Sequence, residues 1–317
     1  MGSGPSLPRR ILITGGAGFV GSNLAREILR RRPDAELTIL DDLSSGSEER
    51  LREIGPGARW KWVRHDLGAA ALPREILGAP FEAVFHLAAI TDTTVTDEKK
   101  MRRTNVEGSR RLFEYALERN IPLVYASSAA VYGITDRRCA EDGPKKPANI
   151  YGVSKLEAEG VAGEYAGNGA RLAGVRYFNV YGPGETHKGK FGSMIWQLSL
   201  QIRAGKRPRV FKHGEQKRDF VHVEDAVDAT IRALAAPSGS VCNVGSGRGR
   251  SFNEVIAALN AALGTRLEPE YFDCPYDFFQ PFTEADIAKA ARELGYKPKY
   301  ALEGGIKAYM DVVRYAS

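Results

Sequence analysis

The sequence has few cysteines and no long apolar run, and each shortage excludes a class of protein. Its three thiols, Cys139, Cys242 and Cys274, stand far apart without a CxxC pair, so neither a disulfide framework nor a zinc site is expected. No run reaches the roughly 18 to 20 apolar residues of a membrane span. Residues 1–6 contain no apolar segment of a signal peptide. We therefore expect no metal, no membrane partner and a cytoplasmic location.

Basic residues are in slight excess and are scattered along the chain. Lys and Arg total 45 against 39 Asp and Glu, for a formal net charge of +6. The run at residues 30–32 is three arginines at the end of an expected helix, where the helix dipole favours cations. No nucleic-acid partner is therefore expected. A mild positive balance suits an anionic diphosphate substrate.

Three spaced glycines follow the first apolar run, residues 11–14, and lead into a helical pattern. In a strand, turn and helix of this kind, Gly15 permits a tight turn or a positive φ. Gly18 lets the backbone approach phosphates, and Gly21 lets the helix pack closely on the strand. The N–H groups at the helix start then favour an anion. The pattern predicts a dinucleotide site.

A second apolar run, residues 37–40, ends at Asp41 and Asp42, 20 residues after Gly21. A carboxylate at this place accepts hydrogen bonds from the adenosine ribose and repels a 2′-phosphate. We therefore predict NAD as the cofactor. NADP stays open as an alternative, because Arg50 and Arg52 lie downstream.

Strand-like runs and helical patterns alternate through most of the chain. This alternation predicts an α/β fold, a Rossmann-type doubly wound parallel sheet with right-handed crossovers. The amino-acid composition becomes glycine-rich and polar at 182–190, which predicts a smaller C-terminal substrate-binding lobe. We expect an NAD-binding domain at 8–181, completed by 223–246, and a lobe at 182–222 and 247–317. Expected strands are 60–66, 83–89, 122–128, 172–179, 208–212 and 241–245; expected helices are 97–120, 150–165, 194–203 and 223–235, and 43–57 is expected to be a loop.

Tyr151 and Lys155 are four residues apart on an expected helix and so share one face. A neighbouring ammonium stabilises a phenolate and lowers the pKa of the phenol. Ser128, at the end of a strand, can bind the same substrate hydroxyl. A YxxxK pair alone is common on amphipathic helices. Together with the glycine turn and the ribose carboxylate it predicts a hydride-transfer site, with Tyr151 as base, Lys155 as its electrostatic partner and ribose anchor, and Ser128 orienting the substrate.

These motifs resemble the extended short-chain dehydrogenase/reductase family of nucleotide-sugar epimerases and dehydratases. The similarity covers nearly the whole chain, with matching segments at 14–21, 86–89, 127–133, 151–155, 176–183 and 218–223. It implies a homodimer formed through the helices at 97–120 and 150–165. The cofactor-binding residues implied are Gly15, Gly18, Phe19, Val20, Gly21, Asp41, Asp42, Asp66, Leu67, Ala88, Ala89, Asn105, Tyr151, Lys155 and Tyr177. The substrate-binding residues implied are Thr91, Ser128, Asn179, His187, Phe211 and Arg218, of which Asn179 and Arg218 would hold the diphosphate of a nucleotide sugar.

Within that family, Thr186–Gly189 and the segment 282–286 are similar to ADP-glycero-manno-heptose 6-epimerases. In that subgroup the lysine of the His-Lys-Gly loop is a second acid/base opposite the tyrosine. Inverting a carbinol through a ketone calls for proton transfer on both faces. The expected catalytic set is therefore Ser128, Tyr151, Lys155 and Lys188. The alternative interpretation of Lys188 is a solvated lysine beside Lys190.

Two departures from the subgroup leave the substrate open. Residues 276–281 stand where related enzymes place an arginine or tyrosine, so Lys212, His213 or Lys217 would bind the diphosphate, or the nucleotide differs. The Asp41–Asp42 pair, with no lysine beside it, is unlike the NADP-preferring members. Two alternatives follow, a UDP-hexose 4-epimerase that turns its sugar over before a single tyrosine and a non-catalytic NAD-binding sensor. A 4,6-dehydratase is disfavoured, because Ala129 and Ala130 stand where it needs a carboxylate pair.

Overall fold

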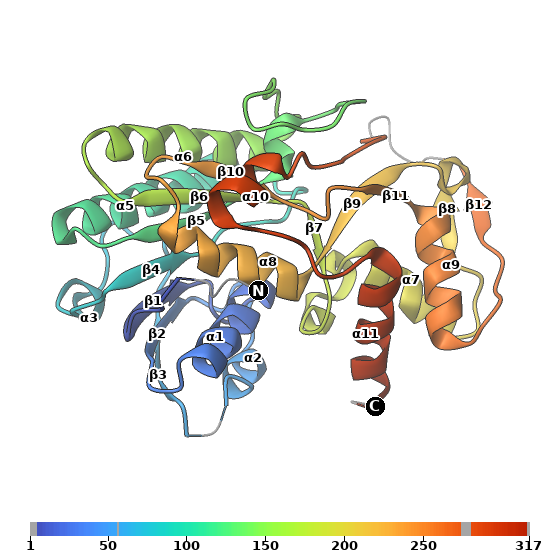
Figure 1. Cartoon of the computed structure of the whole chain (residues 1–317), viewed down its shortest axis with the longest axis horizontal. Helices are drawn as coiled ribbons and strands as arrows, with labels where there is room; N and C mark the ends of the chain where they lie inside the picture. Colours follow the sequence, from blue (N-terminus) through green and yellow to red (C-terminus); the bar gives the residue numbers. More distant parts are fainter. Residues whose placement is uncertain (1–4, 56, 274–279, 316–317) are drawn as a thin grey trace.

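The computed structural model describes residues 5–55, 57–273 and 280–315. Its centre is a seven-stranded sheet in the order β10-β6-β5-β4-β1-β2-β3, in which every pair is parallel (Figure 1). The order reverses between β1 and β4, as in Rossmann folds, where ligands bind outside the carboxyl ends of the strands. The predicted fold class is therefore confirmed. The strands are β1 (Arg10–Thr14), β2 (Glu36–Asp41), β3 (Arg59–Arg64), β4 (Ala83–His86), β5 (Leu123–Ser128), β6 (Leu172–Tyr177) and β10 (Val241–Val244).

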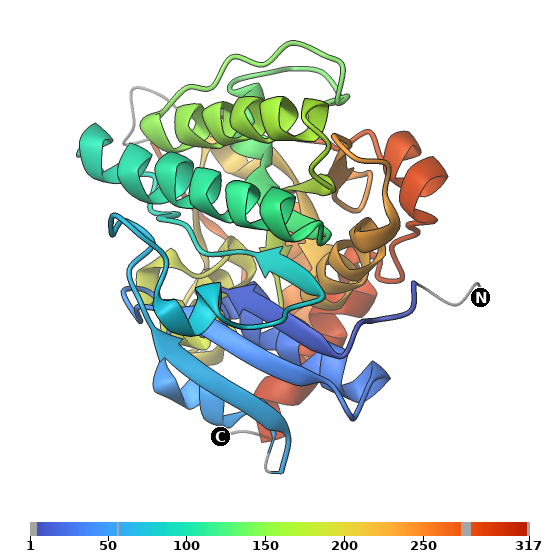
Figure 2. The same cartoon turned by 90° about the vertical axis from the view of Figure 1, so that its left-hand side faces the viewer.

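Helices cover both faces of this sheet (Figures 1 and 2). Along β1 the side chains alternate between two apolar cores, with Ile11 and Ile13 in one and Leu12 in the other. Burial on both faces explains why the strands read as continuous apolar runs. The face with Ile11 carries α1 (Phe19–Arg31), α8 (Val223–Arg232) and α10 (Ala288–Leu294), and the opposite face carries α3 (Arg74–Leu77), α5 (Gly108–Arg119) and α6 (Ile150–Gly167).

Several segments differ from the sequence prediction: residues 74–77 and 217–222 form a helix and a strand that were not predicted, and two further differences concern predicted elements. The predicted loop at 43–57 contains a short helix, α2 (Glu48–Arg52), because the Ser47 hydroxyl caps the N–H of Arg50 and Leu51 is buried. The predicted single helix at 97–120 is α4 (Glu98–Arg102) and α5 joined by a π-helical turn, Arg103–Glu107. π-turns inside helices are frequent at functional sites.

A smaller unit lies beyond the carboxyl ends of β6 and β10 (right side of Figure 1). β7 (Asn179–Tyr181) follows β6 almost directly and pairs with β9 (Lys217–His222), which pairs with β11 (Gly249–Ser251). β8 (Arg209–Phe211) and β12 (Glu270–Phe272) form a separate parallel pair. Tyr181 and Trp196 share its apolar core. The helices packed there are α7 (Met194–Arg203), α9 (Phe252–Leu263) and α11 (Leu302–Tyr315).

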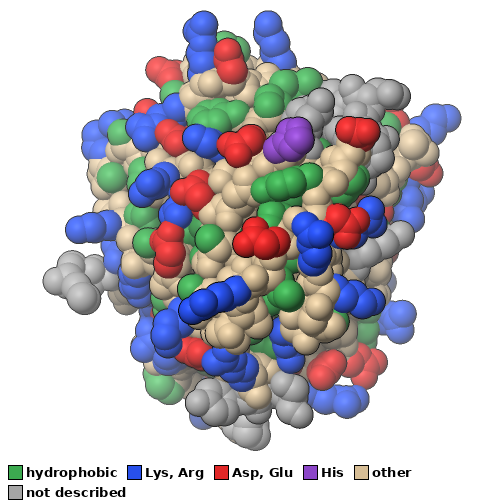
Figure 3. All heavy atoms as spheres, turned by 90° about the vertical axis from the view of Figure 1, so that its right-hand side faces the viewer, with side chains coloured by type: hydrophobic (Ala, Val, Ile, Leu, Met, Phe, Trp, Pro, Cys, Tyr) green, Lys and Arg blue, Asp and Glu red, His purple; other side chains and the backbone are tan. Residues whose placement is uncertain are grey.

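The surface and the cysteines add little chemistry of their own. On the face over α7, α9 and α11, acidic and basic side chains are interspersed (Figure 3). Within the described residues no helix has the length and apolar character needed to cross a bilayer, and no group of three or more His, Cys, Asp or Glu could hold a metal. Cys139 and Cys242 are buried free thiols, and Cys274 lies outside the described residues.

Candidate active site

The glycine turn after β1 leaves no room for side chains at two positions. Gly15 has a φ of +72°, and a Cβ there would lie 2.6 Å from the backbone nitrogen of Ala88. A Cβ at Gly21 would lie 2.1 Å from the carbonyl oxygen of Gly15. Gly18 is the N-cap of α1, which has neither a side-chain cap nor an acidic residue in its first turn. The first N–H groups of α1 are thus left for an anion.

Asp41, the last residue of β2, is buried and joins the strand to the glycine turn. Its carboxylate accepts the N–H of Ala17 at 3.0 Å and the N–H of Leu43 at 2.8 Å. Burial raises its pKa, and these two hydrogen bonds oppose the rise. A carboxylate has about four lone-pair positions, so two remain for a ligand hydroxyl. Asp42 is less buried and accepts from the N–H and hydroxyl of Ser44.

Arg50 is buried between its own helix and the segment at Gly184. Its guanidinium pairs with Glu53 at 2.9 Å and packs against the position where Gly184 lacks a Cβ. Arg52 is exposed and pairs with Glu48. Both arginines are thus paired with carboxylates in this structure, and whether either reaches a 2′-phosphate stays a prediction.

A buried histidine holds the strand end next to the glycine turn, and the sequence analysis assigned it no role. His86 Nδ1 lies 2.7 Å from the hydroxyl of Thr14, which accepts the N–H of Ala88 at 3.2 Å. Its Nε2 lies 2.8 Å from the hydroxyl of Ser109. Burial lowers the pKa of His86 to about 3, so the ring is neutral. The sequence feature that could have indicated this role is that His86 ends a buried strand just before small residues.

Asn105 lies in the π-helical turn and joins two parts of the site. Its amide nitrogen donates to the carbonyl of Ile90 and to the hydroxyl of Ser154, both at 3.0 Å. Its amide oxygen accepts the N–H of Ile90 at 2.8 Å. Asn105 thereby fixes the segment after β4 to α6, with Thr91 exposed beside it. Its predicted contact with a nicotinamide stays a prediction.

The structure brings Ser128, Tyr151 and Lys155 together where β5 meets α6. Asn149 caps α6 by accepting the N–H of Gly152 at 2.8 Å, which places Tyr151 in the first turn. The buried Tyr151 hydroxyl is hydrogen-bonded to Ser128. Lys155 Nζ lies 6.0 Å from the centre of the Tyr151 ring.

The predicted lowering of the Tyr151 pKa is wrong for this structure. Burial raises the pKa, and the hydrogen bond from Ser128 offsets this in part. Lys155 does not reverse the rise, because its Nζ donates to the carbonyl oxygen of Ala126 at 2.8 Å. Burial also lowers the pKa of Lys155 to about 8.

The other predicted cofactor residues line the same edge of the sheet. Tyr177, at the end of β6, shares a 2.5 Å hydrogen bond with Thr230 of α8, so its hydroxyl is occupied. Asp66, after β3, accepts the N–H of Gly68 at 2.6 Å, and Leu67 is buried. Ala88 and Ala89 follow β4, and Phe19 and Val20 begin α1.

Arg218 on β9 has the electrostatics of an anion site. Its Nη1 donates to the carbonyl of Lys217 at 2.8 Å, and its guanidinium lies 5.9 Å from the centre of the Phe252 ring. Among the described residues no carboxylate pairs with it. Burial lowers its pKa to about 10. A partly buried cation without a counter-charge is costly, and an anionic ligand reduces that cost.

Asp219, which the sequence analysis missed, fixes the segments around Arg218. Its fully buried carboxylate accepts the N–H groups of Ser246, Gly247 and Ala285 at 2.6 to 3.0 Å. Asn179 donates weakly to the carbonyl of Asp219 at 3.4 Å. Because these partners are distant in sequence, the one feature of the sequence that could have indicated this role is that Asp219 is a charged residue next to Arg218.

Phe211 lies further out in the smaller unit. It packs edge-to-face on Phe272 with ring centres 6.0 Å apart. Of the segment that departs from the heptose-epimerase pattern, residues 276–279 lie outside the described residues, while Gln280 donates to the carbonyl of Gly133 at 2.6 Å.

Lys188 reaches the glycine turn from the smaller unit. It lies in a 3₁₀ turn, Thr186–Phe191, and its Nζ is 5.7 Å from the centre of the Phe19 ring. Neighbouring His187 binds the carbonyl of Gly184 through Nδ1 at 3.0 Å. Phe19 begins α1 on one face of the sheet, and Tyr151 begins α6 on the other (Figure 1). Lys188 thus lies beside the start of a helix on one face of the sheet, and Tyr151 lies in the first turn of a helix on the other face.

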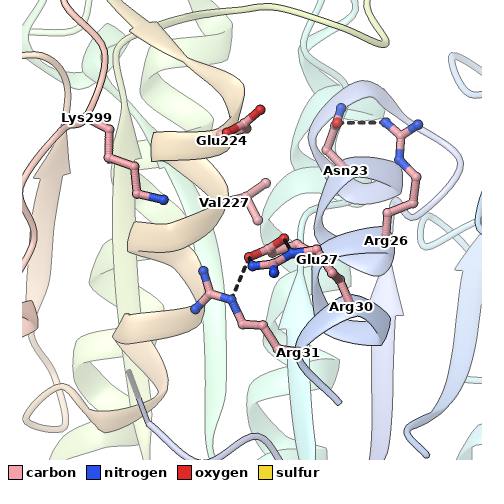
Figure 4. Close-up of a pocket in the computed structure, with 8 residues that line it drawn as sticks. All are labelled: Asn23, Arg26, Glu27, Arg30, Arg31, Glu224, Val227 and Lys299. Carbon is pink, nitrogen blue, oxygen red and sulfur yellow. Dashed lines mark hydrogen bonds and ion pairs between the residues drawn. The ribbon is translucent and has the colours of Figure 1, made fainter. Parts of the chain in front are cut away.

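A cavity of about 410 Å³ lies between α1 and α8, away from these residues (Figure 4). Its charges largely neutralise one another, since Arg30 and Arg31 both pair with Glu27 at 2.7 and 2.6 Å. Arg26 pairs with Glu53 at 3.2 Å. The cavity is therefore not part of the candidate site.

The comparisons with known proteins identify the family. Residues 11–245 match the sequence profile of the NAD dependent epimerase/dehydratase family. The chain belongs to this family. An ADP-L-glycero-D-manno-heptose-6-epimerase from Alkalilimnicola ehrlichii is 38% identical, covering 96% of this chain and 97% of that protein. The predictions of this family and of an enzyme are confirmed.

Solved structures agree with this membership. A crystal structure of Helicobacter pylori ADP-L-glycero-D-manno-heptose-6-epimerase superposes with a TM-score of 0.89 at 37% identity, covering 96% of both chains. The UDP-glucose 4-epimerase of Thermotoga maritima, solved with UDP-glucose, gives a TM-score of 0.85 at 27% identity, covering 97% of this chain and 99% of the other. The epimerase/dehydratase fold therefore extends over nearly the whole chain.

Proposed function

We propose that this protein is an NAD-dependent epimerase of a nucleotide-diphosphate sugar, of the ADP-glycero-manno-heptose 6-epimerase kind. One arrangement carries the proposal: Tyr151, hydrogen-bonded to Ser128, lies in the first turn of α6 on one face of the sheet, and Lys188 lies beside Phe19 at the start of α1 on the other. The Alkalilimnicola and Helicobacter relatives support the choice of subgroup.

The residues around the glycine turn fit a dinucleotide. The bare N-terminus of α1 suits its pyrophosphate, and the free lone pairs of Asp41 suit ribose hydroxyls. We propose NAD over NADP, because the Asp41 carboxylate repels a 2′-phosphate and Arg50 is paired with Glu53. When bound, the dinucleotide would take up hydride from the sugar carbon and return it. Calorimetric titration tests the choice, and tighter binding of NADP than of NAD would contradict it.

Proton transfer at the sugar oxygen falls to Tyr151. Ser128, already within hydrogen-bonding reach of the phenol, orients the hydroxyl that loses its proton. Burial raises the pKa of the phenol in this structure, and the ammonium of Lys155, 6.0 Å from the ring centre, is the positive charge that would oppose this rise during proton transfer. Lys188 would exchange the proton on the other face, so that the carbon can be reduced with inverted configuration.

The substrate diphosphate would bind Arg218. Its partly buried guanidinium lacks a carboxylate partner among the described residues, and Asp219 holds the surrounding segments in place. We propose that Asn179, Thr91, His187 and Phe211 complete the substrate site.

The second candidate is a UDP-hexose 4-epimerase. The observation in its favour is that the Lys188 ammonium packs on the Phe19 ring, as a lysine with a structural role would. A single tyrosine would then act on a sugar that turns over. NMR of the protein with ADP-heptose and with UDP-glucose separates the two: inversion at C6 of the heptose supports the first, inversion at C4 of the hexose the second, and no change in either refutes both.

We further propose a homodimer that works in the cytoplasm. Val153 is an exposed apolar side chain on α6, which packs beside α5. The free, buried thiols of Cys139 and Cys242 suit a reducing compartment. Light scattering after size-exclusion chromatography tests the dimer, and replacing Val153 with Glu should weaken it.

A further inference from the structure

Glu185 is a fully buried carboxylate that the mechanism above does not use. It accepts the N–H of Gly182 at 3.1 Å, and from Ser193 it accepts the hydroxyl at 2.9 Å and the N–H at 2.5 Å. Its three donors thus come from the two ends of one segment, 182–193. A buried carboxylate is costly without such donors. Glu185 therefore closes this segment into a loop.

Lys188 lies inside that loop. The carbonyl of Glu185 accepts the N–H of Lys188 at 2.9 Å, and Gly189, with a φ of +52°, completes the turn. Asn23 of α1 donates to the carbonyl of Pro183 at 3.0 Å, which fixes the start of the loop to the helix that begins with Phe19. The loop thereby sets where the Lys188 side chain meets α1.

The C-terminal helix supports the carboxylate from behind. Tyr309 of α11 is fully buried, and its pKa is raised by burial and then by the charge of Glu185. The phenol is therefore close to the carboxylate. Glu185 is enclosed between the loop and α11, so it has little freedom to move.

The charges of Glu185 and Lys188 also shift each other's pKa, although the two side chains form no ion pair. Burial lowers the pKa of Lys188, and Glu185 opposes this by raising it. Burial raises the pKa of Glu185, which the donors from Ser193 and Gly182 and the charge of Lys188 oppose. The other charged or titratable groups in this neighbourhood are His187 of the loop, Arg50 and Glu53 beside α2, and Arg203 at the end of α7.

We propose that Glu185 is the positioning residue for Lys188, with a buried carboxylate that holds the loop closed and fixes the ammonium beside Phe19. The proposal rests on the proposed role of Lys188 in proton transfer. Glu185 itself would not touch the substrate.

The test measures the titration of Lys188 in the protein without ligands. In ¹³C- and ¹⁵N-lysine NMR spectra, the Lys188 signal is the one lost in Lys188→Arg. Glu185→Gln removes the charge and should lower the Lys188 pKa by about 0.5 to 1 pH unit. Glu185→Asp keeps the charge and should restore most of the shift. An unchanged Lys188 pKa in folded Glu185→Gln would overturn the proposal.

Glu53→Gln is the matched control. It removes a carboxylate that pairs with Arg50 and Arg26 but accepts nothing from the loop, so the Lys188 pKa should stay within about 0.2 pH unit. An equal shift in Glu53→Gln would also contradict the proposal, because any nearby charge would then suffice.

A measurement on the unaltered protein covers the case in which Glu185→Gln fails to fold. The amide hydrogens of Gly182 and Ser193 should exchange at least about 100-fold more slowly than in an unstructured peptide at neutral pH. Unprotected exchange at both would refute the closed loop. If the Lys188 pKa shifts as expected but no sugar nucleotide is epimerised, the role of Glu185 stands and the proposed function fails.

Discussion

Lys155 donates from Nζ to the carbonyl oxygen of Ala126 at 2.8 Å, two residues before Ser128 on the same strand. This bond ties α6 to the end of β5 and keeps the ammonium near the Tyr151 ring without contact to its hydroxyl. Lys155 is also fully buried, which lowers its pKa to about 8. The site therefore contains a lysine that loses its proton more readily than an exposed lysine does.

Lys155 should make the protein more stable as the pH rises from about 8 to about 10.5. Its pKa is near 8 in the folded protein and 10.5 ordinarily, so between these values the unfolded chain binds the extra proton. More protons on the unfolded chain mean that stability rises with pH, by about 3 kcal/mol at most for this shift. Denaturant unfolding of the unaltered protein and of Lys155→Met at pH 8 and pH 10 measures it. A difference between the two that does not change with pH would contradict the buried, easily neutralised lysine.

His86 should make stability fall as the pH drops from about 6.5 to about 3. The folded ring, with a pKa near 3, stays neutral over this range, while the unfolded ring takes up a proton. Its contribution is therefore complete above pH 6.5 and is lost in acid, by on the order of 3 to 5 kcal/mol. His86→Gln keeps a polar side chain next to Thr14 and should show a shallower acid transition in unfolding experiments. Equal acid transitions would mean that His86 is charged in the fold.

The parallel sheet and the turn at Gly15 could be predicted because both leave local patterns in the sequence. Apolar runs mark strands buried on both faces, and the spacing of glycines marks a turn that excludes a Cβ. The helix α2 was missed because a polar composition hid the Ser47 cap and the single buried Leu51. Local sequence patterns thus predicted the main sheet better than they predicted short elements such as α2.

The electrostatics of the site could not be predicted, because they depend on contacts between distant residues. The sequence puts Lys155 on the face of Tyr151, but it does not show that the Ala126 carbonyl takes its hydrogen bond. The partners of Asp219 lie up to 66 residues away, at Ala285. The role of Glu185 likewise depends on a loop closing and on α11 packing behind it. The predicted functions of the site residues stay predictions until ligands are bound.

Replacing Lys188 should separate the two candidate reactions. Lys188→Ala removes an ammonium that lies beside Phe19, across from Tyr151. If two groups exchange protons, turnover should fall about 10²- to 10⁴-fold with substrate affinity largely kept. A 4-epimerase with a single tyrosine should keep most of its turnover. Steady-state kinetics with ADP-heptose and UDP-glucose measures this, with Lys190→Ala as the control in the same loop.

Replacing Arg218 should weaken substrate binding and yet stabilise the fold. Arg218→Met removes a partly buried cation that has no carboxylate partner in the described part of the chain, so the free energy of unfolding should rise by about 1 kcal/mol. KM for the sugar nucleotide should rise at least about tenfold, since a charge-assisted hydrogen bond contributes about 1.5 to 3 kcal/mol.

Arg176 is the matched control for Arg218, since it is a buried arginine with a partner. It pairs with Glu159 at 2.7 Å, with the two side chains 3% and 7% exposed. Arg176→Met leaves the Glu159 carboxylate buried without a counter-charge, with the Ser127 hydroxyl as its remaining donor, so it should lose about 3 to 5 kcal/mol of stability. If Arg218 is held unpaired for a ligand, urea unfolding should therefore show a rise in the free energy of unfolding for Arg218→Met and a fall for Arg176→Met. Two losses of similar size would mean that Arg218 is a structural cation like Arg176, and the diphosphate would have to bind elsewhere.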